Sequence, residues 1–194
     1  MDVAVCILAG GRATRLPGKL LLDVSGVPMV VRVYENVAAG REAALAVADA
    51  SAAPLAGIGA RVVVDAWPDA GPLGGLLSAC AVLRAPWVFA VAGDAPFVTS
   101  AILDALSAAR CAGDEAVVPV HGSGRLEPLA ALYERARVLV AGRELLESGG
   151  RAMHALLDRL HVRTVPFDDG EAFANVNTPA EYERVRARLQ APPG

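Results

Sequence analysis

Lysine is almost absent from this 194-residue sequence, because only one of its 18 basic side chains is a lysine and the rest are arginines. Histidine and cysteine are also scarce, with three of each. They have neither CxxC spacing nor histidine-ligand spacing, which argues against a disulfide framework, a zinc site and a histidine-held metal. The cysteines have apolar neighbours, which predicts buried side chains at Cys6, Cys80 and Cys111.

Long apolar runs are missing as well, although 54% of the residues are hydrophobic. No segment reaches the roughly 18–20 apolar residues that cross a bilayer, and Val3–Ala9 lacks the basic flank of a signal peptide. The net charge of −3 offers no electrostatic attraction to nucleic acid or anionic membranes. We therefore expect a cytoplasmic protein that binds neither, with a single domain over residues 1–194 and a frayed tail at 191–194.

Short apolar runs alternate with segments of helical length. Runs typical of buried strands are Val3–Leu8, Ala43–Val47, Arg61–Val64, Val88–Ala92, Ala116–Val120 and Val162–Val165. Segments typical of helices are Met29–Ala38, Gly75–Leu83, Ser100–Arg110, Arg137–Glu147, Ala152–Leu160 and Pro179–Leu189. Thr178, Pro179 and Glu181 have the spacing of a capped helix start. The alternation predicts an α/β fold, a three-layer sandwich around a mainly parallel, Rossmann-like sheet.

The loop after the first predicted strand has the features of a phosphate cradle. Gly10 and Gly11 allow backbone N–H groups to approach a ligand closely, and Arg12, Arg15 and Lys19 bring three cations into one loop. The segment matches neither GxxxxGK[ST] nor GxGxxG. A solvated basic loop is the alternative interpretation.

The second loop begins at Asp65, after the strand Arg61–Val64. A turn from Gly71 to Gly75 then runs into a predicted helix, and glycines there allow close approach to a ligand or close helix packing. An ordinary turn with solvated aspartates is the alternative.

The third loop places Asp94 at the end of the strand Val88–Ala92. A carboxylate that follows five apolar residues loses hydration, and a Mg²⁺ ion bridging to substrate phosphates compensates that loss. A turn aspartate before Pro96 is the alternative.

A fourth segment carries Asn175 and Asn177, whose amides point to the same side of an extended chain. Amides offer both donors and acceptors, which suits a polar heterocycle or a phosphate. The alternative is that Asn177 and Thr178 only cap the following helix.

Together these segments resemble the signature of the molybdenum cofactor guanylyltransferases, a branch of the nucleotidyltransferases. The matching runs are LAGG with a later arginine and Gly18-Lys19, Asp65 with GPLGGL, Gly-Asp-Ala-Pro-Phe around Asp94, and Phe-Ala-Asn-Val-Asn-Thr-Pro at 173–179. This chain has Gly18 where the family has an acid, Gly74 where it has alanine, and Glu127 where many relatives have histidine. The resemblance implies a fold of the nucleotide-diphospho-sugar transferase type.

The resemblance also implies an activity: transfer of GMP from GTP to the terminal phosphate of molybdopterin, with or without molybdenum. The products are the guanine dinucleotide cofactor and pyrophosphate, and Mg²⁺ is the cofactor. Molybdenum-insertion proteins and acceptor molybdoenzymes are the implied protein partners.

Individual residues of this sequence take the family's roles by position. Lys19, Arg15 and Asp94 are the implied catalytic residues, with Asp94 as the metal ligand and Asn175 and Asn177 as acceptor contacts. The implied nucleotide contacts are Leu8, Ala9, Gly10, Gly11, Arg12, Lys19, Asp65, Gly71, Gly75 and Asp94.

Two alternatives stay open. Transfer of CMP to molybdopterin, or of a nucleotide to another phosphorylated acceptor, uses the same fold; Gly10 favours guanine, because cytidylyl relatives tend to carry alanine there. The other alternative is a non-catalytic nucleotide-binding protein, against which Lys19 and Asp94 argue.

Overall fold

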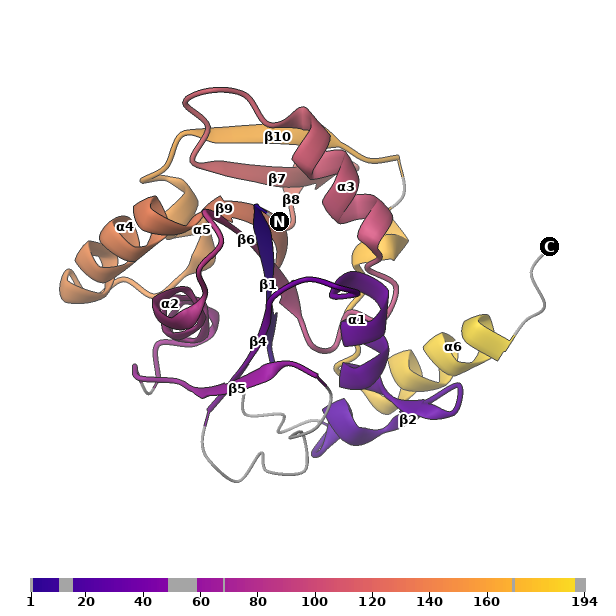
Figure 1. Cartoon of the computed structure of the whole chain (residues 1–194). Helices are drawn as coiled ribbons and strands as arrows, with labels where there is room; N and C mark the ends of the chain where they lie inside the picture. The colour runs from indigo at the N-terminus through magenta and orange to yellow at the C-terminus, as the bar shows by residue number, and fades with distance from the viewer. Residues whose placement is uncertain (1, 11–15, 49–58, 68, 169, 191–194) are drawn as a thin grey trace.

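The computed structural model describes residues 2–10, 16–48, 59–67, 69–168 and 170–190. A large sheet lies between two layers of helices (Figure 1). One face is covered by α2 (Pro72–Val82), α4 (Arg135–Glu147) and α5 (Met153–Leu157). The other face is covered by α1 (Met29–Val37) and α3 (Ser100–Ala109). This arrangement confirms the predicted α/β three-layer sandwich.

Within the described residues, the strand order of the sheet is β10–β7–β9–β6–β1–β4–β5, and β8 pairs with β7. The strands are β1 (Val3–Leu8), β4 (Ala43–Val47), β5 (Arg61–Val64), β6 (Trp87–Ala92), β7 (Ala116–His121), β8 (Arg125–Leu126), β9 (Ala130–Glu134) and β10 (Val162–Pro166). β9 runs antiparallel to β6 and β7, whereas β1 is parallel to both β4 and β6. Ligands of open α/β sheets bind beyond the carboxyl ends of strands where the strand order reverses, and β1 occupies that position here.

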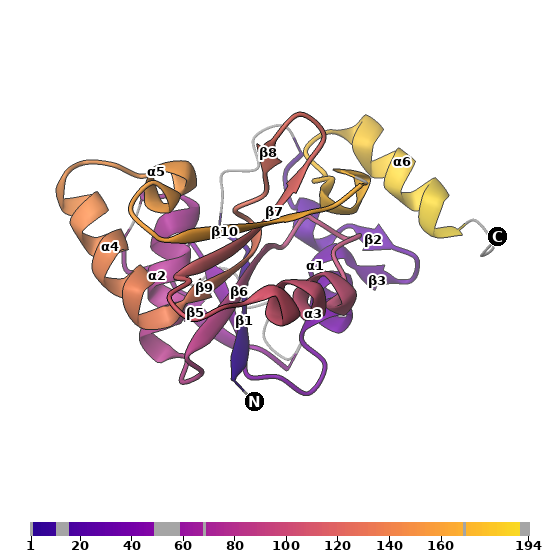
Figure 2. The same ribbon diagram turned by 90° about the horizontal axis from the view of Figure 1, so that it is seen from above.

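A small lobe stands beside the sheet. It consists of the hairpin β2 (Asp23–Val24) and β3 (Val27–Pro28) with the helix α6 (Pro179–Gln190) (Figure 2). Its apolar centre includes Val24, Met29, Val176 and Val185. The Tyr182 hydroxyl also donates to the Asp23 carbonyl at 2.6 Å. The hairpin is not among the predicted elements, because two-residue strands are too short for a periodic pattern.

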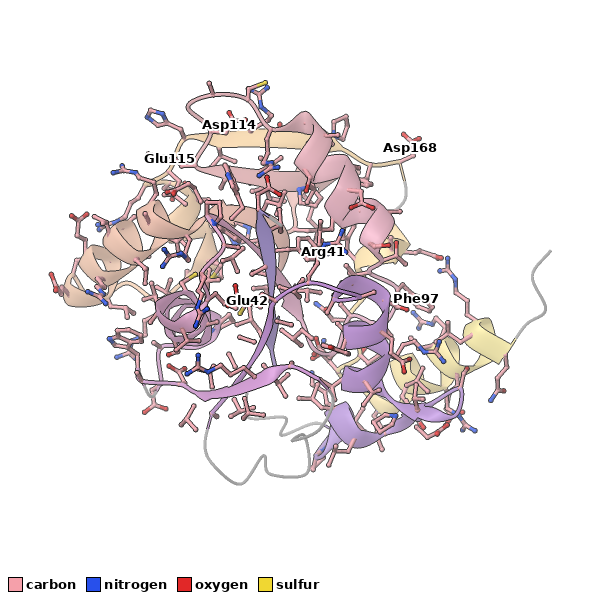
Figure 3. All side chains as sticks on the ribbon, viewed as in Figure 1. Arg41, Glu42, Phe97, Asp114, Glu115 and Asp168 are labelled. Carbon is pink, nitrogen blue, oxygen red and sulfur yellow. The ribbon has the colours of Figure 1, made fainter. Side chains whose placement is uncertain are left out.

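The amino ends of the strands carry ion pairs and backbone contacts. Figure 3 shows Asp114 and Glu115 at the start of β7, and Arg41 and Glu42 just before β4. Asp114 binds Arg163 at 2.6 Å, and Glu42 accepts from the Arg84 N–H at 3.0 Å. These carboxylates are therefore engaged in structural contacts at the edge opposite the carboxyl ends of the parallel strands.

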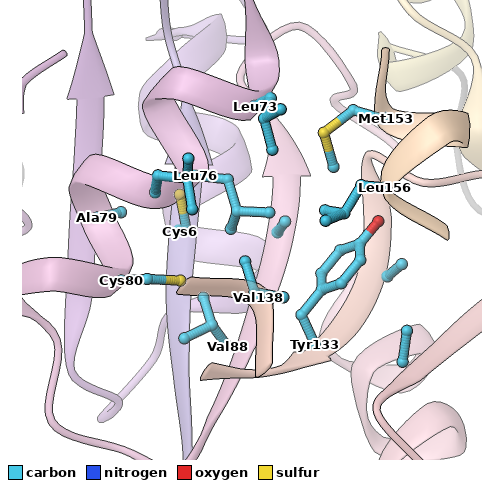
Figure 4. Close-up of a cluster of buried hydrophobic side chains, with 14 of the residues drawn as sticks. Cys6, Leu73, Leu76, Ala79, Cys80, Val88, Tyr133, Val138, Met153 and Leu156 are labelled. Carbon is cyan, nitrogen blue, oxygen red and sulfur yellow. The ribbon is translucent and has the colours of Figure 1, made fainter. Parts of the chain in front are cut away.

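Both faces of β1 are buried, and its alternate side chains enter two different cores. Figure 4 shows part of the core on the α2 side, where Cys6 lies close to Cys80 and Leu76 of α2. Burial raises the pKa of the Cys80 thiol to about 12, so it stays protonated and unreactive. The prediction of three buried cysteines was wrong for Cys111, which is exposed in the loop after α3.

Several helix boundaries differ from the predicted ones. α2 begins at Pro72 rather than Gly75, because a proline is favourable in the first turn. α4 begins at Arg135 rather than Arg137, since the Glu134 side chain accepts from two backbone N–H groups and caps the helix. α5 covers five residues of the longer predicted segment. None of the helices in the described ranges has the length and apolar character needed to cross a membrane.

Candidate active site

The loops after β1 and β6 meet beyond the carboxyl ends of these strands, next to the end of β4. The Gly93 N–H donates to the Leu8 carbonyl at 3.0 Å, and the Ala9 N–H donates to the Ala46 carbonyl at 2.8 Å. A Cβ on Gly93 would lie 3.2 Å from the Leu8 carbonyl oxygen. Glycine therefore lets the loop after β6 approach the loop after β1 closely, which brings the predicted site segments together.

The first loop is described in part. Leu8 is buried at the end of β1, Ala9 is half-buried, and Gly10 is exposed. A Cβ on Gly10 would lie 3.2 Å from the Ala48 nitrogen, so the loop follows the end of β4 closely. Gly11, Arg12 and Arg15 lie outside the described residues.

The loop re-enters the described part at Leu16 and turns at Gly18. Gly18 has φ +68°, in the left-handed region that glycine adopts without strain. A short 3₁₀ turn, Lys19–Leu21, follows at once, so the turn at Gly18 sets the position from which the Lys19 side chain leaves the backbone.

Lys19, which follows the first loop, contacts one residue of the third loop and one residue of the fourth segment. Its ammonium forms an ion pair with the Asp94 carboxylate and donates to Asn177 Oδ1 at 2.7 Å. The side chains of Lys19 and Asp94 are only 14% and 15% exposed. Because partial burial reduces solvent screening, this ion pair is stronger than an ordinary surface pair.

The segment 173–179, called the acceptor segment below after its predicted role, is held in place by hydrogen bonds. The Val176 N–H donates to the Asp94 carbonyl at 2.9 Å, which ties this segment to the third loop. Glu181 accepts from the N–H groups of Asn177 and Thr178 at 2.8 and 2.9 Å, and the Glu181 N–H donates to the Thr178 hydroxyl. This capping box confirms the predicted start of α6. Asn175 is half-buried on the same segment.

Asp65 belongs to a separate cluster at the end of β5. Its Oδ1 accepts from the Trp67 N–H at 2.8 Å and lies 3.2 Å from the Ser78 hydroxyl. Gly71 has φ +63° directly before α2. A Cβ on Gly75 would lie 3.0 Å from Leu8 Cδ2, so this glycine allows α2 to pack against the end of β1.

Glu127 takes part in a group of polar contacts next to the acceptor segment. Its carboxylate lies 2.9 Å from His121 Nε2 and 3.1 Å from Arg125 Nε. The His121 ring stacks on Phe173, the first residue of the acceptor segment, at 5.5 Å between centroids. The sequence interpretation did not include these contacts, because β8 is too short to predict.

The donors around Asp94 suit a metal ion that is shared with a ligand. In the described ranges, no group of three or more His, Cys, Asp or Glu side chains is placed to hold a metal. Asp94 supplies one carboxylate, and Mg²⁺ commonly binds one or two carboxylates while phosphates and water fill its remaining positions. The residues fit Mg²⁺ that enters with a phosphorylated substrate.

Two features of the site are not predicted from the sequence: the Ser78 hydroxyl, and the contact of Glu181 with Asn177. The sequence predicts Glu181 only as a capping residue. Ser78 has a weak sequence signal, because it is a polar residue within the apolar helix α2 and follows Gly74 by one helical turn.

Comparison with known proteins matches residues 5–164 to the model of the MobA-like NTP transferase domain. The molybdenum cofactor guanylyltransferase of Cupriavidus metallidurans is 34% identical, over 98% of this chain and 97% of its own. The structure of molybdopterin-guanine dinucleotide biosynthesis protein A from Archaeoglobus fulgidus has a TM-score of 0.80 at 26% identity, covering 97% of this chain and 98% of that one. A 2-C-methyl-D-erythritol 4-phosphate cytidylyltransferase from Thermus thermophilus has a TM-score of 0.74 at 18% identity, over 98% and 100% of the chains, and shows the shared fold alone.

Proposed function

The chain belongs to the family of MobA-like NTP transferase domains, and from this membership we propose that it transfers GMP from GTP to the terminal phosphate of molybdopterin. The acceptor is molybdopterin with or without bound molybdenum, and pyrophosphate is the second product. One observation carries the proposal: Lys19 contacts Asp94 and Asn177 together, so the predicted triphosphate, metal and acceptor elements meet at one ammonium group. Phosphoryl transfer needs such a point, because two anions must be held against their mutual repulsion.

The reaction forms a bond between an acceptor phosphate oxygen and the α-phosphorus of GTP. The bond from the α-phosphorus to the bridging oxygen breaks, and its electron pair leaves with pyrophosphate. The attacking oxygen is already an anion, so no general base is required. The protein's contribution is then positioning and the stabilisation of charge.

Lys19 and Arg15, with Arg12, hold the triphosphate in this proposal. Lys19 leaves Asp94 for the phosphates, and its compact ammonium follows them through the change of geometry better than a rigid guanidinium fork.

Asp94 is the proposed ligand of Mg²⁺. When bound, this ion neutralises the phosphate oxygens and the leaving pyrophosphate. The nucleotide lies against Leu8, Ala9, Gly10 and Gly11 of the first loop. Asp65, Gly71 and Gly75 complete its site.

Asn175 and Asn177 are the proposed acceptor contacts. When Lys19 turns to the triphosphate, Asn177 Oδ1 is released from the ammonium and becomes available to a donor of the pterin. Molybdenum-insertion proteins and acceptor molybdoenzymes are the proposed protein partners. The free thiols of Cys6 and Cys80 agree with a reducing cytoplasm as the location.

A panel of nucleoside triphosphates with purified molybdopterin, followed by pyrophosphate release, tests the proposal. We expect turnover with GTP and Mg²⁺ only when molybdopterin is present. Turnover with CTP instead of GTP identifies a cytidylyltransferase. Binding of a nucleotide without turnover of any of them favours a non-catalytic nucleotide-binding protein.

A further inference from the structure

Ser78 is a buried polar side chain whose role the proposed reaction leaves open. In the described part of the chain, it is the single buried residue with a polar side chain apart from Tyr133, and it is 3% exposed. It lies in α2, among apolar residues such as Leu77 and Ala79. A buried hydroxyl costs free energy unless it is hydrogen-bonded, so its partners indicate what it is for.

All the partners of the Ser78 hydroxyl belong to the Asp65 loop or to the first turn of α2. The oxygen accepts from the Ala66 N–H at 2.9 Å. Its one proton is directed to Asp65 Oδ1 at 3.2 Å or to the Gly74 carbonyl at 2.9 Å. The hydroxyl therefore links the Asp65 loop to α2 as both an acceptor and a donor.

Gly74 determines where the Asp65 carboxylate can lie. A Cβ at Gly74 would be 2.8 Å from Asp65 Oδ1, 2.7 Å from Oδ2 and 2.9 Å from the Trp67 carbonyl oxygen. No side chain fits there without moving the carboxylate, so glycine permits it to rest directly on the helix.

The two oxygens of the Asp65 carboxylate differ in their contacts. Oδ1 accepts a hydrogen bond from the Trp67 N–H and faces the Ser78 hydroxyl. Among the described residues, none donates a hydrogen bond to Oδ2. We propose that Ser78 and Gly74 are positioning residues that fix Asp65 so that Oδ2 accepts one hydrogen bond from the nucleoside of GTP. The donor is the 2-amino group of guanine or the 2′-hydroxyl of ribose. The inference rests on the proposed function, and neither Ser78 nor Gly74 contacts the nucleotide.

The binding of GTP to Ser78→Ala tests this proposal, by calorimetry and by steady-state kinetics. Loss of the hydroxyl leaves Oδ1 with the Trp67 N–H alone and loosens the carboxylate, so we expect the Kd and KM for GTP to rise about tenfold, the lower end of the range for one hydrogen bond to a charged group. The kcat stays within about twofold, because Asp65 binds substrate and transition state alike. Gly74→Ala is a second variant and shifts the same constants in the same direction.

A double-mutant cycle separates positioning from a general structural effect. In an Asp65→Ala background, we expect Ser78→Ala to leave the Kd for GTP unchanged. Ser107→Ala is the matched control, since Ser107 is a helical serine of α3 whose buried hydroxyl has no partner. It leaves the Kd for GTP at the wild-type value.

Inosine triphosphate, which lacks the 2-amino group, and 2′-deoxyguanosine triphosphate identify the donor. One of these two analogues lacks the group that donates to Asp65 Oδ2. We expect that analogue to bind wild-type and Ser78→Ala protein with the same Kd. The proposal is overturned if Ser78→Ala binds GTP as wild type does, if its penalty persists in the Asp65→Ala background, or if both analogues keep the full penalty. If wild-type protein neither binds nor uses GTP, the proposed function itself fails.

Discussion

The ammonium of Lys19 forms an ion pair with the carboxylate of Asp94, across 75 residues of sequence. The pair joins the loop after β1 to the loop after β6, and Asn177 adds the segment before α6 through a 2.7 Å hydrogen bond. The lysine thus acts as the counter-ion of Asp94. Loss of either charge leaves a poorly solvated partner without compensation, and the first two predictions follow from this relationship.

Lys19→Ala is expected to lower pyrophosphate release from GTP by about 100-fold or more, because a cation that stabilises the transferring phosphate is lost. Lys19→Arg retains the charge but replaces a compact ammonium with a planar fork, and we expect it to recover little of the rate. Arg143→Ala, on the exposed surface of α4, is the matched control and keeps wild-type turnover. Full activity of Lys19→Ala contradicts the proposed role of the lysine.

Asp94→Ala is expected to abolish pyrophosphate release, and removal of the divalent metal by a chelator has the same effect on wild-type protein. Asp104→Ala changes an exposed aspartate of α3 and serves as the control with normal turnover.

The ion pair of Lys19 with Asp94 also predicts how the affinity for a metal ion changes when no nucleotide is present. Since the Lys19 ammonium and a metal ion compete for the Asp94 carboxylate, Lys19→Ala should bind Mn²⁺ more tightly than wild type when no nucleotide is present. Electron paramagnetic resonance of free Mn²⁺ measures this affinity. Equal affinities of the two proteins, or tight binding that survives in Lys19→Ala/Asp94→Ala, would show that Asp94 is not the ligand.

Stability is expected to fall in acid because of the two carboxylates at the start of β7. Hydrogen bonds from Arg163 lower the pKa of Asp114, and the His161 backbone N–H, with Arg137, lowers the pKa of Glu115. Both folded-state pKa values lie below the ordinary values of 3.8 and 4.5. Their stabilisation is therefore fully present above pH 4.5 and is lost as the pH falls through the folded-state values.

Thermal unfolding of wild type and Asp114→Asn/Glu115→Gln over this acid range measures the effect. The variant should be the less stable protein at neutral pH, and the two melting temperatures should converge at the acid end. Melting curves that stay equally far apart at every pH would contradict the assignment.

The capping box of α6 predicts a stability effect near the acceptor segment. Glu181→Ala removes the acceptor of the Asn177 and Thr178 N–H groups, and we expect the free energy of unfolding to fall by about 1 kcal/mol. Glu183→Ala, on the exposed side of the same helix, is the control and changes it little. Chemical denaturation measures both variants. A loss for Glu183→Ala as large as that for Glu181→Ala would argue against the cap.

Local patterns in the sequence determined the layers of the fold and the loops that carry the site. Apolar runs such as Val3–Leu8 could be read because a strand buried on both faces has no polar positions. Lys19 and Asp94 could be singled out because each directly follows a glycine in a loop beyond an apolar strand. The start of α6 could be predicted because its cap, Thr178 to Glu181, lies within four consecutive residues.

Tertiary structure alone decided which of these segments touch. The antiparallel strand β9 and the hairpin β2–β3 depend on pairing with distant partners, so no local period predicts them. The contact of Lys19 with Asn177 spans 158 residues of sequence, and Ser78 acquires its role only where α2 packs under the Asp65 loop. Sequence determines what each segment can form, because propensity and patterning are local; packing determines which side chains share a site, because burial depends on the whole chain.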